Sequence, residues 1–489
     1  MSTSPRTPPR IHHDTSLRAE VFLRHTGPVT RTFREDKARP SPWPLAAVCV
    51  GYFMVILDAT VVNVALPTLS RDLHATTSGL QWVVDAYSLV FAALLLSAGA
   101  LGDRRGARAV FQAGVGLFAL ASLACGLAPS TALLVVARGG QGVGAALAVP
   151  SSLSLLQAAY PDRAARARAF GIWGGVAGIA AAAGPVVGGA LVTRLGWRSV
   201  FFVNVPIGAL GLVLAQRFLP SPPRRPHGVD LPGQAAGAAC LAGLTVALIE
   251  AGSAGWTSPA VVAGFGLCVV AGVVFVAIER AVRRPMLPLS LFTSPTFAAA
   301  TVVGLLINLG FYGELFVMSL YLQQLRGLTP LMAGIALLPQ MAMAVIGSMA
   351  SGRVMARSGP RLPMLIGLTV GGLGLVGLTT VGLHSAYWTL AVPFVATGLG
   401  MSITMPAATA AVMEAAPTER GGIASGTLNA ARQVGGVVGV ALLGTLVAQP
   451  ASFIPGLHLG MAIAGGAFFV AVALTTAGVG RVRVPQPSA

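Results

Sequence analysis

Three acidic residues lie inside long apolar segments of this 489-residue chain, namely Asp58, Asp85 and Glu314. A carboxylate in the hydrocarbon of a bilayer costs at least a few kcal/mol, so it is rarely kept there without a task such as carrying a proton or holding a cation. These three residues therefore predict that the chain is a transport protein.

Arg138 also lies inside an apolar segment, where a guanidinium should face a cavity and hold an acidic or carbonyl partner. Asp58 is the natural partner, because the segment 45–67 runs outward and the segment 131–158 runs inward, which gives the two residues compatible depths. Pairing would favour the charged carboxylate, and desolvation would favour the neutral one. We therefore expect the proton affinity of this pair to depend on which side of the membrane it faces.

Each of the other two buried acids has two interpretations. Asp85 is either a proton site or an interfacial carboxylate beside Trp82 near the end of its segment. Glu314 either binds a proton or cationic substrate, or is held structurally by a partner such as Arg432. Glu250 and Glu279 lie at the ends of apolar segments and are interpreted as interfacial.

The polar residues expected to contact a substrate within the segments are Asn63, Asn308, Tyr312, Glu314, Asn429 and Arg432.

The composition indicates the class of structure that must position these residues. The chain is 55% hydrophobic and 10% charged, with a mean hydropathy of +0.77, which is typical of an all-α polytopic membrane protein. A spanning helix needs about 20 mostly apolar residues, and fourteen segments qualify. They are 45–67, 80–101, 109–128, 131–158, 170–193, 199–219, 231–251, 259–279, 297–322, 331–351, 362–383, 388–413, 425–448 and 457–480.

The basic residues orient these fourteen helices. Of the 32 Lys and Arg residues, 26 fall on one side of the predicted topology and only Arg71, Arg194, Arg198 and Arg326 on the other. Positive charge accumulates on the cytoplasmic side, so we expect both termini to be cytoplasmic and the protein to lie in the inner (plasma) membrane. The net charge of +17 is explained by this bias, and we expect no nucleic-acid partner.

An internal repeat divides the predicted helices. Residues 99–108 follow the second segment and residues 352–361 follow the tenth, with two Gly and two Arg in the same register. Parallel repeats with a substrate cavity between them are a known transporter architecture. The predicted organisation is a tail (1–44), a six-helix half (45–219), a linker with two inserted helices (220–295), a second six-helix half (296–480) and a short tail (481–489).

Six motifs resemble one known family, the fourteen-helix drug/proton antiporters of the major facilitator superfamily (QacA/EmrB-like multidrug or antibiotic exporters). The resemblance covers roughly residues 45–480. The motifs are Leu57–Pro67, Gly99–Arg108, Arg138 with Gln141 and Gly142, Gly184–Gly189, Trp197–Gly208, and Asn429–Gly439. Ala107 and Ala180 depart from the family pattern. The resemblance implies the major facilitator fold and alternating access between the two halves.

The resemblance also implies roles for two of these motifs. A conformational latch between the halves would be formed by the loop residues Gly99, Asp103, Arg104, Gly106 and Arg108. The alternative is that these residues form only a solvated turn. Asp103 itself would cap the third helix or pair with an arginine. The antiporter motif consists of Gly184, Pro185, Gly188 and Gly189, which permit a bend and close helix contact. Close packing alone would explain the same residues.

The sequence therefore predicts a proton-coupled antiporter that exports a small amphipathic or cationic drug or antibiotic. Its expected partners are the small-molecule substrate, protons and the lipid bilayer, and it is expected to be a monomer. The histidines and acidic residues form no catalytic or metal-ligand spacing, so no enzyme activity, metal or cofactor is expected. The alternatives are an importer or facilitator of a small metabolite and a non-transporting membrane sensor.

Overall fold

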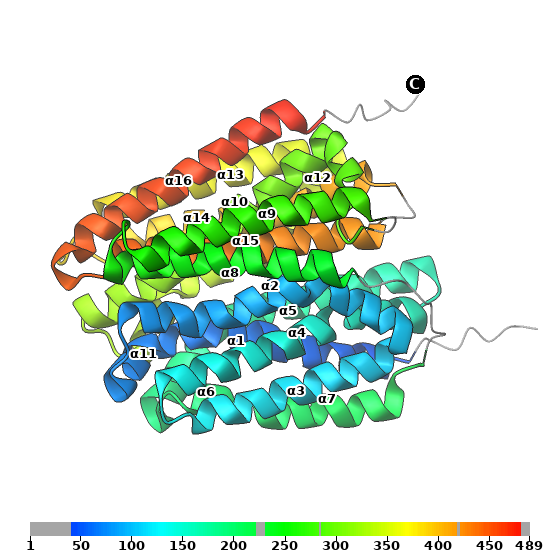
Figure 1. Ribbon diagram of the computed structural model, residues 1–489, viewed down its shortest axis with the longest axis horizontal. Coiled ribbons are helices and arrows are strands. Elements are labelled where there is room, and N and C mark those ends of the chain that lie inside the picture. The colour runs from blue at the N-terminus through cyan, green and yellow to red at the C-terminus, as the bar shows by residue number, and fades with distance from the viewer. Residues whose placement is uncertain (1–40, 222–229, 283–284, 418–420, 481–489) are drawn as a thin grey trace, which may run out of the picture. The chain divides into compact units, whose positions relative to one another are not determined.

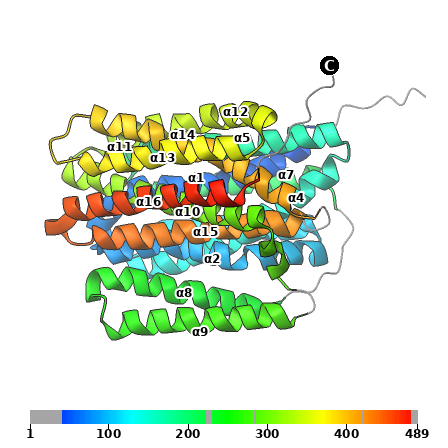
Figure 2. The same cartoon turned by 90° about the horizontal axis from the view of Figure 1, so that it is seen from above.

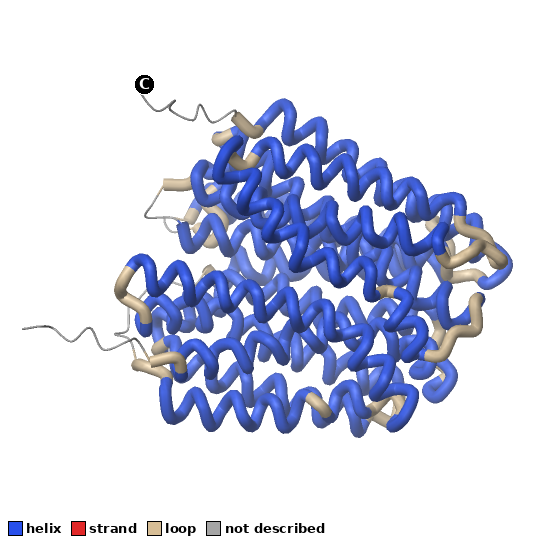
Figure 3. The backbone as a smooth tube through the Cα atoms, turned by 180° about the vertical axis from the view of Figure 1, so that it is seen from behind, coloured by secondary structure: helices blue, strands red, loops and turns tan. Residues whose placement is uncertain are grey.

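A computed structural model describes residues 41–221, 230–282, 285–417 and 421–480 of the chain. These described ranges contain helices and turns and no strand (Figure 3). Nearly all of the tail 1–44 and the whole of the tail 481–489 lie outside the described residues.

The helices follow the predicted order, and two predicted helices are each broken once. The first group consists of α1 (Trp43–Leu73), α2 (Thr77–Arg105), α3 (Ala107–Leu127), α4 (Thr131–Ala159), α5 (Arg163–Leu195), α6 (Ser199–Phe202) and α7 (Asn204–Phe218). The pair α8 (Leu231–Ala254) and α9 (Pro259–Ala281) comes next. The second group consists of α10 (Pro295–Leu320), a π-helical turn (Tyr321–Leu325), α11 (Pro330–Ala336), α12 (Leu338–Ser358), α13 (Arg361–Gly377), α14 (Trp388–Ala415), α15 (Gly421–Leu446) and α16 (Phe453–Gly478).

Short polar residues start many of these helices. The side chains of Thr76, Ser130 and Asp162 accept hydrogen bonds from the third backbone N–H that follows each of them, at the starts of α2, α4 and α5. Such caps satisfy backbone donors that have no partner inside the helix. At the other end of α1, the helix continues through Pro67 to Leu73, six residues beyond the predicted end, because packed neighbours can accommodate a proline inside a membrane helix.

Thirteen helices of the described chain are long and apolar enough to cross a membrane. The one expected span that is missing from this set is α15, whose first half carries Asn429, Arg432 and Gln433. Large apolar side chains point outward, and Val262, Val269 and Val273 on α9 are each at least 60% exposed. Such a surface requires lipid, so the chain is a multi-pass membrane protein, as the composition predicts.

The two inserted helices form a pair at one edge of the bundle (Figure 2). The pair contacts α2 of the first group and α15 of the second group. Glu279 on α9 is buried at 4% exposure and accepts a hydrogen bond from the Leu287 N–H at 3.0 Å. The linker after α9 therefore folds back over the Glu279 carboxylate in the last turn of the helix.

The internal repeat is visible in three dimensions. Gly106 follows the last residue of α2 and Gly359 follows the last residue of α12, and both glycines have positive φ, at 100° and 72°. Arg108 then donates to the Gln216 carbonyl at the end of α7, and Arg361 donates to the Thr476 carbonyl at the end of α16. Each arginine thus joins the third predicted helix of its group to the sixth.

The expected latch residues lie at the end of α2. Gly99 and Asp103 belong to the last two turns of α2, Arg104 is exposed, and Gly106 forms the whole connection to α3. The N-cap of α3 is Gly106, three residues beyond Asp103. The backbone of α2 continues through Asp103, so the connection is shorter than the gap between the predicted segments 80–101 and 109–128.

The two groups are joined at one end of the bundle. Thr77 donates to the Ala448 carbonyl at 3.4 Å, Gln81 to the Ala441 carbonyl at 2.7 Å, and Ser319 to the Asn63 carbonyl at 2.6 Å. We call this end, where α1 ends and α2 begins, the closed end; it lies at the left in Figure 1. The opposite end, where α1 begins and α16 ends, is called the terminal end.

Packing along α5 differs between the two ends. Near the terminal end, the glycines of α5 have open space beside them: a side-chain carbon added there would have no atom within 4 Å. These glycines are Gly171, Gly174, Gly175 and Gly178. Near the closed end, Gly188 and Gly189 are in tight contact with α1 and α11. The helix α5 is therefore closely packed on α1 and α11 at the closed end and has open space beside it toward the terminal end.

Candidate functional site

Asp58 lies in the middle of α1 with no solvent exposure, and three side chains donate hydrogen bonds to it. Arg138 of α4 forms an ion pair with Oδ2, which is the only ion pair found in the described part of the chain. Gln141 and Asn204 donate to Oδ1 at 2.9 and 2.7 Å. The carboxylate thus links α1, α4 and α7.

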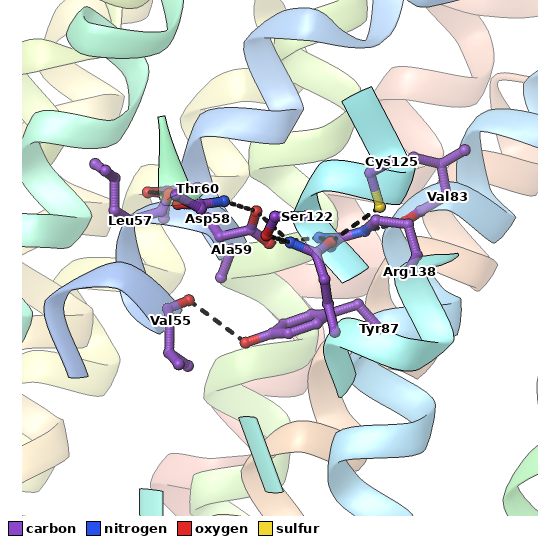
Figure 4. Close-up of polar contacts among 12 residues, drawn as sticks. Val55, Leu57, Asp58, Ala59, Thr60, Val83, Tyr87, Ser122, Cys125 and Arg138 are labelled. Carbon is purple, nitrogen blue, oxygen red and sulfur yellow. Dashed lines mark hydrogen bonds and ion pairs between the residues drawn. The ribbon is translucent and has the colours of Figure 1, made fainter. Parts of the chain in front are cut away.

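Arg138 is 1% exposed and has partners on several sides (Figure 4). Its Nε donates to the Val83 carbonyl at 2.8 Å, and Nη1 also donates to the Gln141 side-chain oxygen at 2.8 Å. The guanidinium lies over the Tyr87 ring, 4.5 Å from its centroid. Charge-assisted hydrogen bonds and a cation–π contact together offset the free energy cost of removing this cation from water.

Sequence reasoning missed the neutral members of this network. Gln141 and Asn204 both stand in motifs that were noticed, but nothing in the spacing showed that they turn toward Asp58. Ser122 accepts from Gln141 at 2.7 Å and completes the network from α3. Asn204 reaches Asp58 because the sixth predicted helix is broken at Val203, so Asn204 begins α7.

Glu314 occupies a separate buried site in the second group. It has no solvent exposure, and it accepts hydrogen bonds from Gln340 of α12 at 3.0 Å and from Thr397 of α14 at 3.2 Å. Arg432 forms no ion pair with it. Glu314 therefore has structural partners, as one alternative predicted, but Arg432 is not one of them, because Glu314 turns toward α12 and α14.

The sites of Asp58 and Glu314 are related by the internal repeat. Gln141 and Thr397 contact the two acids, and each is followed by a glycine packed on the second helix of its group. Gly142 lies against the Tyr87 carbonyl, and Gly398 lies against the Gln340 carbonyl.

The two related sites differ in charge. Three residues before Gln141 stands Arg138, and three residues before Thr397 stands Phe394. The first group thus has a carboxylate paired with a cation, whereas the second has a carboxylate with neutral donors only. Proton binding should therefore have different consequences at the two sites.

Asp85 is fully buried in α2, and neither of its carboxylate oxygens has a hydrogen-bond partner in the described chain. It lies one helical turn beyond Gln81, which bonds α15 of the other group. The interpretation of Asp85 as an interfacial carboxylate was wrong, since the end of α2 is covered by α15 and α8.

The remaining expected substrate contacts lie in different places. Asn63 is 2% exposed and donates to the Ala59 carbonyl of its own helix at 3.2 Å. Asn308 is 2% exposed, and its side-chain oxygen has no partner among the described residues. Tyr312, Asn429 and Arg432 are partly exposed, so only these three have accessible space beside them.

The expected antiporter motif forms the contact of α5 with both groups. A side-chain carbon at Gly188 would lie 2.9 Å from the Val61 carbonyl of α1, and one at Gly189 would lie 2.6 Å from the Pro330 carbonyl of α11. Gly184 packs on Thr60, and the Pro185 carbonyl packs on Gly334. These small residues let three helices meet at the closed end.

Replacing Gly189 with Val should therefore hinder closure at this end. The added carbon would meet backbone atoms of Pro330 and Leu331, and overpacking of at least about 1.4 kcal/mol, within the usual range, changes the equilibrium by about tenfold or more. We expect substrate flux in liposomes to fall by about that factor. Gly171→Val on the same helix, where the space is open, is the matched control; an equal loss in the control would refute the steric explanation.

The family model "Major Facilitator Superfamily" matches residues 48–440. The chain is 40% identical to a methylenomycin A resistance protein of Bacillus subtilis over 431 residues, which is 88% of this chain and 92% of that one. It is 38% identical to a methylenomycin A resistance protein of Streptomyces coelicolor, covering 83% and 86% of the two chains. It is also 40% identical to the multidrug resistance protein Stp of Mycobacterium tuberculosis, covering 83% and 75%.

Solved structures share the fold at low sequence identity. A bacterial homologue of the human lysosomal transporter Spinster, in an inward-facing and occupied conformation, matches with a TM-score of 0.65 and 17% identity over 90% of this chain and 97% of that one. A POT family transporter in complex with a thioalcohol-conjugated peptide matches with a TM-score of 0.67 and 13% identity over 89% and 96%.

Proposed function

Because this chain belongs to the Major Facilitator Superfamily, we propose that it exports a small amphipathic drug or antibiotic across the cell membrane in exchange for protons. Its relatives are named as resistance proteins for methylenomycin A and for several drugs, which supports export. The observation that carries proton coupling is the buried ion pair of Asp58 and Arg138.

The ion pair provides a way for a proton to change the packing of the first group. A proton on Asp58 would compete with Arg138 for the carboxylate, while Arg138 would keep the Val83 carbonyl and Gln141 as partners. Because Asp58 is bonded to α4 and α7, its neutralisation would weaken the contacts of α1 with both helices. One proton moving through the membrane potential supplies about 2.3 kcal/mol per 100 mV, enough to drive such a cycle.

We further propose that the molecule works as two six-helix halves (45–219 and 296–480) with the linker 220–295 inserted between them. The halves would rock between a state closed at one end and a state closed at the other, as a monomer with both termini in the cytoplasm. In this scheme Asp103, Arg104 and Arg108 would contribute to a latch at the terminal end when that end closes, and Glu314 would be a secondary proton site.

Asp85 is proposed as a proton site linked to the closed end. An ionised carboxylate with no donor in a membrane interior is costly, so a proton on Asp85 favours closure and a rise in pH opposes it. The Asp85→Asn side chain is permanently neutral. We expect this variant to retain substrate binding and to turn over about tenfold more slowly, because a change of about 1.4 kcal/mol in the free energy of closure corresponds to that factor. Initial export rates measured against substrate concentration test this expectation, and unchanged turnover at all pH values would contradict it.

Transport in purified liposomes tests the proposed function. The probes are methylenomycin A, tetracenomycin C and puromycin, the compounds that appear in the names of relatives. We expect an imposed pH gradient to drive at least one compound opposite to the flow of protons, and an ionophore to abolish the effect. Movement of the compound together with protons would indicate an importer, binding without flux would indicate a sensor, and either result would contradict the proposal.

A further inference from the structure

Arg432 is a cation inside the second group, and no acidic side chain among the described residues forms an ion pair with it. The only ion pair in the described chain joins other residues, and Glu314 is bonded to α12 and α14. The Arg432 Nη1 donates to the side-chain oxygen of Asn429 at 3.3 Å, and its Nε is buried with no partner among the described residues. A guanidinium has five N–H donors, so most of its hydrogen-bonding capacity is unused.

Glycines in the surrounding helices make room for this side chain. The Arg432 stem lies over Gly304 of α10, where a side-chain carbon would be 3.3 Å from its Cγ. The Tyr312 ring lies over Gly436, which is one turn beyond Arg432 on α15. A side-chain carbon at Gly436 would be 3.3 Å from that ring. The guanidinium is close enough to the hydroxyl groups of Tyr312 and Tyr52 to interact electrostatically with both. Arg432 is therefore within electrostatic range of Tyr52, which belongs to the first group.

Tyr52 is part of a flat aromatic surface of the first group. Tyr52 of α1 and Trp173 of α5 stack with ring centroids 3.9 Å apart and an angle of 5° between their planes. Both side chains are partly exposed, although they lie well inside the membrane-spanning helices α1 and α5. A stacked pair with accessible space beside it is suited to an apolar ring of a ligand.

We propose that the transported compound carries a carboxylate, or another planar and negatively charged oxygen group, which Arg432 binds while a flat apolar part of the compound packs on Tyr52 and Trp173. This inference rests on the proposed function, because it names the substrate class of the same transporter. Arg binds planar anions through paired N–H donors. The tyrosine hydroxyls supply further donors, and no acidic side chain in the described chain pairs with Arg432.

The inference replaces the expectation of a cationic substrate. That expectation depended on Glu314, which is fully buried and already bonded by Gln340 and Thr397. Asp58 is likewise saturated by Arg138, Gln141 and Asn204. Asp85, the other acid near α15, is fully buried and is proposed above as a proton site, whereas the Arg432 side chain is partly exposed.

Binding of three matched probes to the purified full-length protein tests the inference. The probes share one flat ring system: 2-naphthoate (anionic), 2-naphthamide (neutral) and 2-naphthylmethylammonium (cationic). Calorimetry is expected to show naphthoate binding at least about tenfold more tightly than naphthamide, the factor that corresponds to one charge-assisted contact of about 1.5 kcal/mol. The ammonium probe is expected to bind most weakly, and tighter binding of the ammonium probe than of naphthoate would overturn the proposal.

Variants assign any preference to the proposed residues. Arg432→Gln should lose the preference for naphthoate and keep the affinity for naphthamide, whereas Arg432→Lys should keep part of the preference. Tyr52→Leu should weaken the binding of both naphthoate and naphthamide. Arg326→Gln, which removes an arginine at the closed end bonded to the Ser385 carbonyl, is the control and should change neither affinity.

The experiments distinguish a failure of this inference from a failure of the proposed function. Retained binding of naphthamide shows that the Arg432→Gln protein is folded, and an unchanged preference in that protein would overturn the assignment of Arg432. Proton-driven flux with no preference for the anion would overturn only the substrate class. An anion preference without proton-driven flux would overturn only the proposed function.

Discussion

Asp58→Asn protein is expected to lose proton-driven accumulation of substrate while still inserting into the membrane. Asn keeps an oxygen that can accept from Gln141 and Asn204, but it cannot exchange a proton or pair with Arg138. For one proton per substrate, a driving force of 100 mV is worth about 2.3 kcal/mol, which equals roughly a 40-fold concentration ratio. We expect that ratio to fall to one in liposomes.

Two further variants separate the loss of coupling from a loss of stability. Asp58→Asn leaves Arg138 buried without a counter-charge, which should destabilise the protein by about 3–5 kcal/mol. The double variant Asp58→Asn/Arg138→Gln removes both charges, so it should recover much of the stability in a thermal unfolding assay and none of the coupling. Asp72→Asn, which makes the same chemical change at an exposed position, should behave like the native protein. Recovery of coupling in the double variant would refute the role of the pair.

A disulfide across the closed end is expected to stop transport. Thr77 and Ala448 come from different groups and are joined by a hydrogen bond of 3.4 Å, so cysteines at both positions should cross-link when this end is closed. If the cycle requires the two groups to separate there, oxidised Thr77→Cys/Ala448→Cys protein should lose more than about nine-tenths of its flux, and reduction should restore it.

The native cysteines require a matched background for that experiment. Cys49 and Cys125 are buried, whereas Cys240 and Cys268 are partly exposed with their sulfur atoms 3.7 Å apart. The cross-link is therefore made in Cys240→Ser/Cys268→Ser protein, with each single cysteine variant as a control. Full activity in the oxidised, cross-linked protein would show that the closed end does not open during transport.

The Asp58–Arg138 pair illustrates what the sequence alone can predict. Both residues are charged in apolar segments, and the direction of each helix fixes their depth. The structure brings them together. Gln141 and Asn204 could not be assigned in the same way, because a neutral amide is tolerated in many places and its orientation depends on how α4 and α7 pack against α1.

The burial of Asp85 and Glu279 depends on tertiary contacts that no local pattern reveals. Asp85 is covered by helices that lie far away in the sequence, and Glu279 is covered by the linker after α9. The isolation of Arg432 is a similar case, since only the structure shows that Glu314 turns away from α15. Sequence patterns therefore predict which charges enter the membrane, and packing decides which of them meet.

The dependence of substrate accumulation on the imposed pH gradient tests the central claim most directly. In liposomes with no electrical potential, the ratio of substrate concentrations at steady state is measured over a range of pH differences for the native and Asp58→Asn proteins. Exchange of one proton per substrate predicts a rise of about tenfold per pH unit in the native protein and no rise in the variant. Equal slopes in the two proteins would contradict the assignment of proton coupling to Asp58 and Arg138.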